Sequence, residues 1–343
     1  MSGIRQHTIP RSLIKGFSEV GKDQYVWVHK KDGLNFKTNI NNVSVVKSFY
    51  TPSGKTDIDD LITKEETAFS TLIDRIRNAG SIETKDYQGI ASFIAHLELR
   101  TLHIRTSYEF TLNYMLEQAL SLLDTPKVFE QFLSRSVATD FENRAKAYAA
   151  DTGKSNRETR QLIDKARLVA KKMLPELVPK FLKKFDELKK SPEKLKSTFQ
   201  AAAESAQITA LGRSISPEEK VIGYKTLVFT ILKTEPTLPL GDSAVLFHTN
   251  GNSSWKSATF AGDQVDIIAL PIRNDLIIIG HKSSATVDLK EVRTAIARCS
   301  LDYIISKNEQ LDPMTLAEEI GKDALPFTAI QINELVRKSL GLV

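Results

Sequence analysis

The stretch VDIIALPIRNDLIIIGHK, residues 265–282, holds two short apolar runs rich in Ile on either side of Arg-Asn-Asp. Short runs of β-branched residues bounded by polar turn residues are typical of β-strands. TLVFTILK and AVLFH, residues 226–233 and 244–248, have the same character and are bounded by polar segments that contain Pro or Gly. The sequence after Lys225 therefore predicts a group of strands.

A second group of strands is predicted near the N-terminus. QYVWVH, residues 24–29, alternates aromatic and β-branched residues, and Asp32-Gly33 after it is a good hairpin turn. FKTNINNVSVV, residues 36–46, is a plausible return strand. The first strands can complete the late sheet, in which case the chain is one domain.

The residues between these groups have helical periodicity. Apolar residues from Leu61 to Ile76 fall on one face of a helix that begins near Asp57 and is closed by Gly80. Pro175, Pro179 and Pro192 are expected to divide a later helical stretch. Helices are also predicted over residues 86–123, 126–150, 155–212, 288–306 and 312–321, with Ser-Pro helix starts at Ser191 and Ser216 and a capping box between Ser216 and Glu219.

The predicted fold class is therefore α+β and mostly helical, with a small β-sheet formed by N-terminal and C-terminal strands packed on a long-helix middle. We expect a single domain over residues 1–343, with a basic, insertion-like helical block at about 153–212. From Gly153 to Lys196 there are fourteen Lys or Arg and six Asp or Glu, a balance of +8 in a chain whose net charge is +5. The positive charge is thus concentrated in one region.

Composition limits the class of protein. A single cysteine, Cys299, excludes a disulfide framework or a Cys-based zinc site within one chain. No apolar run approaches the roughly 20 residues that span a bilayer, and the N-terminus has no signal-peptide pattern. We expect a cytoplasmic protein with no membrane partner. The sequence does not indicate an oligomeric state.

The basic block over residues 153–196 has two interpretations. It could bind nucleic acid through the phosphates, or its Lys pairs could be the solvated face of amphipathic helices. Phe181, Phe185 and Phe199 keep helical spacing, which favours packing over base stacking.

Polar side chains that could form a site occur in three segments. RQHTIPRSLIKGF, residues 5–17, groups Gln6, His7 and Arg11 around Pro10, either as the wall of a site or as terminal packing. HLELRTLH places His96, Arg100 and His103 on one helix face, and a buried Arg100 would require a partner. Asp242, in a Gly-Asp-Ser turn, could orient a His or Arg or bind a metal, or could cap the turn.

Two acidic residues, Glu65 and Glu66, lie on the first long helix, where such pairs usually face solvent. The chain has no P-loop, no Gly-rich dinucleotide motif, no His-Glu-x-x-His and no Gly-x-Ser-x-Gly. A nuclease core of the Asp…Glu-x-Lys type is rejected at Lys282, because Gly280 stands where the acid is required. No tight His cluster suggests a transition-metal site.

The segment QHTIPRSLIKGF resembles the start of a widespread microbial family known as domain of unknown function 4238. Further matches follow in order along the chain: NNVSVVKSFY, LITKEETAFSTLIDRI, FIAHLELRT, LPLGDSAVL and IIALPIRNDLIIIG. Gly241, Ala244 and Thr294 depart from the family pattern. The resemblance places Gln6, His7, Arg11, Arg100 and Asp242 in motif positions, favours Glu65 or Glu66 as a site residue, and does not clearly include His96 or His103. It implies no reaction.

Three hypotheses follow. In the first, a hydrolase acts on nucleic acid or nucleotide phosphates, with His7, Asp242 and Glu65 or Glu66 as catalytic groups, Gln6, Arg11 and Arg100 as substrate-binding groups, and Mg²⁺ as a compatible but unidentified cofactor. In the second, a non-catalytic protein binds nucleic acid or another ligand. In the third, the motif residues form a buried polar network that fixes the β unit onto the helices.

Overall fold

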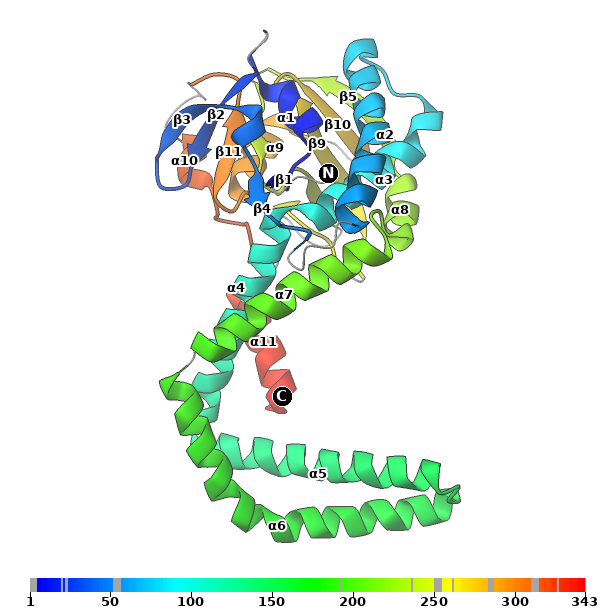
Figure 1. Cartoon of the computed structure of the whole chain (residues 1–343), viewed down its shortest axis with the longest axis vertical. Helices are drawn as coiled ribbons and strands as arrows, with labels where there is room; N and C mark the ends of the chain where they lie inside the picture. Colours follow the sequence, from blue (N-terminus) through cyan, green and yellow to red (C-terminus); the bar gives the residue numbers. More distant parts are fainter. Residues whose placement is uncertain are drawn as a thin grey trace. The chain divides into compact units, whose positions relative to one another are not determined.

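The structure is a computed structural model of the chain (Figure 1). It describes residues 5–19, 21, 24–51, 57–191, 193–235, 237–249, 255–260, 262–282, 287–309, 315–325 and 327–342. The chain divides into two compact units, unit 1 with Met1–Phe110 and Ala201–Pro326 and unit 2 with Thr111–Gln200 and Phe327–Val343. Whether the two fold as one domain stays a prediction.

Unit 1 holds all the described strands, and α4 and α7 continue from it into unit 2. Its strands are β1 (Arg5–His7), β2 (Tyr25–Lys30), β3 (Asn35–Asn39), β4 (Val45–Lys47), β5 (Val228–Lys233), β6 (Leu240–Gly241), β7 (Leu246–Thr249), β8 (Trp255–Lys256), β9 (Val265–Arg273), β10 (Leu276–His281) and β11 (Tyr303–Ser306). Its helices are α1 (Arg11–Ile14), η1 (Lys15–Phe17), η2 (Ile40–Asn42), α2 (Asp57–Ala79), η3 (Thr84–Asp86), α3 (Tyr87–Arg100), α8 (Glu218–Lys225), α9 (Leu289–Arg298) and α10 (Thr315–Glu319), with parts of α4 (Leu102–Leu123) and α7 (Glu193–Arg213).

The described strands form three antiparallel sheets. The order is β5-β10-β9-β7-β8 in the largest, β3-β2-β11-β6 in the second, and β1-β4 in the third. The second sheet joins N-terminal strands to C-terminal ones, because β11 lies between β2 and β6. The α+β class, the mostly helical content and the joining of the two ends of the chain are thus confirmed.

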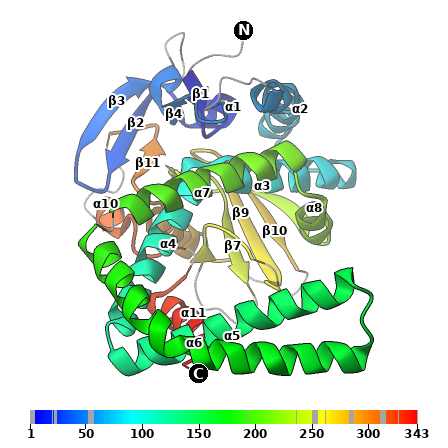
Figure 2. The ribbon, with the colours of Figure 1, turned by 60° about the horizontal axis from the view of Figure 1, so that its bottom comes forward.

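The largest sheet is covered on both faces, as Figure 2 shows for the α3 side. Successive side chains of a strand point to opposite faces. In β9, Ile268 and Leu270 pack in the core that includes α3 and α8, while Ile267 and Ala269 pack in the core that includes α9 and α10. This double burial explains why the β9 and β10 sequences are apolar almost throughout instead of alternating.

Several predicted elements end where tertiary contacts intervene. The return strand predicted over 36–46 ends at Asn39, and Val45–Lys47 pairs with β1 instead. The helix predicted over 86–123 breaks at Thr101, which has an extended backbone and whose hydroxyl accepts a hydrogen bond from the Ile104 amide. The helix predicted over 288–306 ends at Arg298, and Tyr303–Ser306 forms β11.

Two further predictions about helix ends are wrong. Pro175 and Pro179 lie inside α6 and do not divide it, and Pro192 lies outside the described residues. Packing of α6 on α5 offsets the cost of the interior prolines. Ser216 does not cap α8, since its hydroxyl donates to the Ser92 carbonyl 2.9 Å away. The turn at Asp32-Gly33 and the helix from Asp57 to Ala79 are confirmed.

Unit 2 is helical in its described residues. It contains α5 (Pro126–Asp151), α6 (Asn156–Lys190), α11 (Ala329–Leu340) and parts of α4 and α7. Helices α5 and α6 form an antiparallel hairpin, visible in Figure 1, and α11 packs on α4 residues such as Tyr114 and Leu122. The unit carries 20 Lys or Arg and 13 Asp or Glu, a net charge of +7, which leaves −2 for unit 1.

Candidate functional site

The opening segment begins as β1, which pairs with β4 and so buries Gln6. The Gln6 side chain accepts a hydrogen bond from the Tyr50 amide at 2.7 Å and donates one to the Thr51 hydroxyl at 3.2 Å. Both polar ends of the amide are therefore satisfied within the protein. Gln6 holds the segment around Tyr50 against β1.

His7, the next residue, faces the protein backbone. Its Nδ1 lies 3.1 Å from the Val43 carbonyl oxygen. Burial lowers the pKa of His7 to about 4, and the nearby charges of Arg100 and Arg11 act in the same direction. The imidazole is thus neutral at pH 7. Because the Val43 carbonyl oxygen can only accept a hydrogen bond, the proton of the neutral ring lies on Nδ1.

Arg100 lies at the end of α3 and is only 2% exposed. Its Nε donates to the Tyr50 hydroxyl at 3.2 Å, its Nη1 lies 3.2 Å from His96 Nε2, and its Nη2 donates to the His7 carbonyl. Its charge is balanced by an ion pair with Glu66. We call Gln6, His7, Tyr50, Glu66, His96 and Arg100 the Arg100 cluster.

The other predicted residues of the helices are not all part of this cluster. Glu66 is 29% exposed and pairs with Arg100, whereas Glu65 is exposed on α2. His103 is buried, and burial lowers its pKa to about 4. The Arg100 cluster therefore contains four of the predicted site residues, Gln6, His7, Glu66 and Arg100.

Asp242 lies apart from these residues in the hydrogen-bond network. Its carboxylate accepts hydrogen bonds from the amides of Leu301, Asp302 and Tyr303, at 2.8, 2.7 and 3.3 Å. Burial raises its pKa to about 6, although the three amides oppose this shift. No hydrogen bond between described residues joins Asp242 to His7. Its contacts fix the start of β11, which explains why the predicted helix stops before Tyr303.

Arg11 lines a polar hollow in a different part of unit 1, which we call the cationic depression. It consists of two adjoining cavities of about 520 and 480 Å³ that share Lys15, Gln24 and Asp74. The lining residues are Arg11, Ser12, Lys15, Gly16, Ser18, Glu19, Gly21, Gln24, Ile40, Asn41, Ser70, Asp74, Arg77, Asn78, Arg273, Asn274 and Lys307. Five of them are cations and two are carboxylates.

Three cations of the cationic depression have no acidic partner among the described residues. Arg11 donates to the Asn41 side chain at 2.9 Å, and neither it nor Lys15 or Lys307 forms an ion pair with any residue that the structure describes. Arg273 pairs with Asp275, which is not among the lining residues. The hollow therefore has positive charge that the protein leaves uncompensated, in a unit whose net charge is −2.

Arg77 forms the rigid floor of the depression. It donates to the carbonyls of Ile272, Ser12 and Leu13 at 2.7, 2.8 and 3.0 Å, and it pairs with Asp74 at 2.9 Å. Burial lowers its pKa, Asp74 raises it, and the neighbouring Arg273 lowers it further.

Gly16 makes the approach of β9 to this floor sterically feasible. A Cβ at this position would lie 2.1 Å from the Ile272 carbonyl oxygen and 2.8 Å from Arg77 Nη2. The glycine of the opening segment is therefore required for backbone contact.

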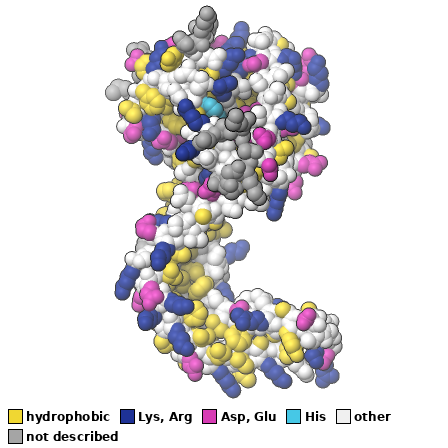
Figure 3. All heavy atoms as spheres, viewed as in Figure 1, with side chains coloured by type: hydrophobic (Ala, Val, Ile, Leu, Met, Phe, Trp, Pro, Cys, Tyr) yellow, Lys and Arg dark blue, Asp and Glu magenta, His cyan; other side chains and the backbone are white. Residues whose placement is uncertain are grey.

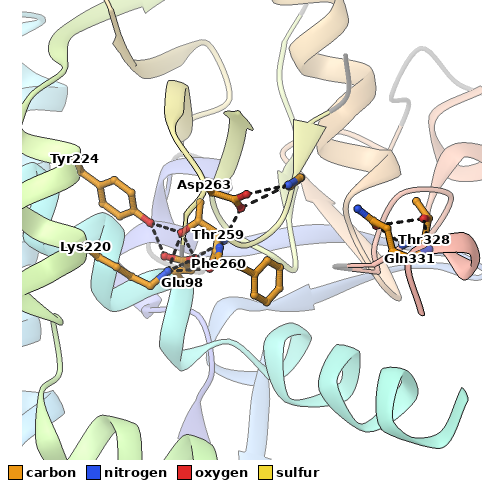
Figure 4. A network of polar contacts seen from close by, with 9 residues as sticks. Glu98, Lys220, Tyr224, Thr259, Phe260, Asp263, Thr328 and Gln331 are labelled. Carbon is orange, nitrogen blue, oxygen red and sulfur yellow. Dashed lines mark hydrogen bonds and ion pairs between the residues drawn. The ribbon is translucent and has the colours of Figure 1, made fainter. Parts of the chain in front are cut away.

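Sequence reasoning missed a second polar network, drawn in Figure 4. The buried Glu98 carboxylate accepts from Lys220 at 2.8 Å, from Tyr224 at 2.6 Å, and from the Thr259 amide and hydroxyl at 2.6 and 2.9 Å. The Lys220 ammonium also donates to the Thr259 carbonyl and hydroxyl. These residues lie beside a pocket of about 620 Å³ that Lys220, Tyr224 and Thr259 help to line.

Only one sequence signal pointed to that network. Lys220 and Tyr224 have the i, i+4 spacing that places both on one face of α8. Thr259 and Glu98 are 161 residues apart. The network joins α8 to α3. All three donors of the Lys220 ammonium have acceptors inside the protein, so this cation has no free hydrogen-bond donor for a ligand.

The comparison with family models gives one result. The model of the family described as a protein of unknown function (DUF4238) matches residues 5–313. This chain belongs to that family. No curated protein and no solved structure matches the chain.

In this DUF4238 protein, two motif segments meet at the cationic depression. The opening segment supplies Arg11 and Lys15, the end of β9 supplies Arg273, and the turn before β10 supplies Asn274. Among the described residues, no group of three His, Cys, Asp or Glu side chains could hold a metal ion. No helix in the described ranges is long and apolar enough to cross a membrane.

Proposed function

We propose that the chain binds a phosphate-bearing ligand, a nucleotide or the end of a nucleic acid strand, at the cationic depression. The observation that carries this proposal is the excess of five cations over two carboxylates in one hollow, with Arg11, Lys15 and Lys307 unpaired among described residues. Arg binds phosphate through a planar fork and Lys binds it as a point charge.

The size and the neutral polar groups of the hollow support a nucleotide-sized ligand. Pockets for small molecules usually span about 300–1,000 Å³, and each of the two cavities falls in that range. The side chains of Gln24, Asn78 and Asn274 offer donors and acceptors for a sugar or a base.

Hydrolysis at phosphorus by His7 has less support. A general base needs a nitrogen within hydrogen-bond reach of the substrate. With Nδ1 bonded to the Val43 carbonyl, that nitrogen would be His7 Nε2, and His7 is not among the residues that line the cationic depression. Arg100 cannot clamp a phosphate without losing its contacts to Glu66, Tyr50 and the His7 carbonyl. Hydrolysis and the role of Mg²⁺ remain predictions of the hydrolase hypothesis, and the cytoplasmic location remains a prediction from composition.

The test is a titration of the full chain with inorganic phosphate, nucleoside triphosphates and short RNA and DNA strands, each with and without Mg²⁺. Calorimetry reports binding, and product analysis reports hydrolysis. We expect Lys15→Ala with Lys307→Ala to weaken binding by about tenfold or more. The matched control is Lys64→Ala with Lys225→Ala, two exposed lysines of unit 1 outside the depression. Equal affinity of both double variants would overturn the proposal.

A second candidate function is binding of nucleic acid through α6. All eleven of its Lys and Arg are exposed, and only Arg167 and Lys189 form ion pairs with described residues. This candidate predicts an affinity for mixed-sequence DNA or RNA that falls steeply with salt. An affinity without a salt slope would argue against it.

A further inference from the structure

The hairpin of α5 and α6 in unit 2 buries only part of its apolar surface. The two helices pack through Phe129, Leu133 and Val137 of α5 and Ala170 and Phe185 of α6. Beside this contact runs a groove of about 680 Å³. A pair of amphipathic helices has an open apolar side unless a third element covers it.

Large apolar side chains line the groove and are exposed in it. Met173, Phe181 and Leu188 of α6 are 39%, 43% and 42% exposed. Phe132 and Phe141 of α5 line the same groove. Figure 3 shows apolar side chains gathered along these helices among Lys and Arg. A contiguous apolar patch with polar edges marks an interaction surface.

The lip of the groove on α6 is positively charged. Lys184 lines the groove, and Lys180 precedes it by one turn on the same side of the helix. Neither forms an ion pair with a residue that the structure describes, whereas Arg144 across the groove is paired with Asp140 at 2.9 Å. An occupant with carboxylates next to its apolar side would compensate these two charges.

We propose that this groove binds an amphipathic helix of a protein partner, with its apolar side chains in the groove and acidic side chains beside Lys180 and Lys184. A helix fits because the side-chain ridges of a third helix can pack between those of α5 and α6. A second copy of this chain is disfavoured, since α6 carries eleven Lys or Arg against five Asp or Glu and would approach a like charge. The proposal is independent of the phosphate site, because every groove residue belongs to unit 2.

The test uses two peptides of about four helical turns. Both have Leu at i, i+3, i+4 and i+7, and their remaining positions are mostly Glu in one and mostly Lys in the other. Fluorescence anisotropy measures their binding to the full chain. We expect the Glu peptide to bind about tenfold more tightly than the Lys peptide, and Phe181→Ser to weaken it by a similar factor. Phe181 is partly exposed, so circular dichroism should show an unchanged fold.

Charge reversal is the decisive variant. Lys180→Glu with Lys184→Glu should weaken the Glu peptide and strengthen the Lys peptide, while Lys64→Glu with Lys225→Glu in unit 1 should change neither. Three results would overturn the proposal: no binding of either peptide, an undiminished preference for the Glu peptide after charge reversal, or a dimer in sedimentation that Phe181→Ser disperses. The last result would assign the groove to a second copy of the chain. Displacement of the Glu peptide by duplex DNA would assign the lip to nucleic acid and also count against the proposal.

Discussion

The Arg100 cluster and the cationic depression both use residues of the opening segment, but they use positive charge in opposite ways. In the cluster, a guanidinium that is 2% exposed has an acidic partner and acceptors on His7, Tyr50 and His96. In the depression, Lys15 and Lys307 have no ion partner among the described residues. The comparison teaches that the type of residue in a motif does not reveal its role, whereas the satisfaction of its donors does.

The largest expected effect is the loss of Arg100. Arg100→Met should lower the free energy of unfolding by about 3–5 kcal/mol, because it leaves Glu66 without its cation and removes the guanidinium donor to the His7 carbonyl. Chemical denaturation of wild type and variant measures this. Glu66→Gln, at a partly exposed residue, should cost less. A change below about 1 kcal/mol for Arg100→Met would mean that the cluster is not what holds β1 in place.

The next effect is the dependence of stability on pH. Burial holds the folded-state pKa of His7, His96 and His103 at about 4, below the ordinary value of 6.5, so the unfolded chain binds more protons between these values. Asp242, raised to about 6, opposes this with one proton. With about two protons in net excess on unfolding, stability should fall by roughly 2.7 kcal/mol per pH unit as pH drops from 6 to 4.5.

Urea unfolding at several pH values measures this slope. Asp242→Asn removes the opposing proton, and its slope should be steeper than that of the wild type, whatever its absolute stability. If the free energy of unfolding did not change with pH over this range, the three imidazoles would be more accessible to solvent than their burial in the structure indicates.

A smaller effect is expected from the hydroxyl of Tyr50. It donates to the Arg100 carbonyl at 3.0 Å and accepts from Arg100 Nε. Tyr50→Phe should lower the unfolding free energy by about 1–3 kcal/mol, the cost of unsatisfied buried partners. A melting temperature equal to that of the wild type would show that the ring alone positions Arg100.

The smallest effect on stability belongs to the depression. Lys15→Ala with Lys307→Ala should change the unfolding free energy by less than about 0.5 kcal/mol, because Lys15 is exposed, Lys307 is half-buried, and neither forms an ion pair with a residue that the structure describes. The contrast between the Arg100 cluster and the cationic depression is sharpened if the same variant loses phosphate binding. A large loss of stability would instead give these lysines the structural role that the cluster has.

Local pattern was sufficient to predict the α+β class, the hairpin at Asp32-Gly33 and the helix from Asp57. It also predicted that Arg100 would need a partner, because a guanidinium in an apolar helix must be compensated. It did not give the acceptors, since the His7 carbonyl is 93 residues away in the chain. Helix ends at Thr101 and Arg298 were missed because contacts from Gln207 and Asp242 override propensity there.

The site residues were harder to predict than the elements. Four residues that line the depression come from four distant segments of the chain: Lys15, Arg77, Arg273 and Lys307. In the sequence, each of them alone is indistinguishable from an ordinary surface charge or helix residue. Glu98 was missed for a similar reason, because its donors Lys220 and Thr259 lie more than 120 residues later. Among the predicted site residues, only Arg11 lines the cationic depression.

The pairing of β2 with β11 has a consequence for biosynthesis. Trp27 lies opposite Ser306, and His29 bonds to the same serine across 277 residues of chain. At about 5–20 residues per second, a ribosome needs roughly 15–55 s to supply that strand after β2 has emerged. For that time the first hairpin carries an open edge that can accept a foreign strand. A nascent chain of this protein must therefore be protected from aggregation until almost its whole length has been translated.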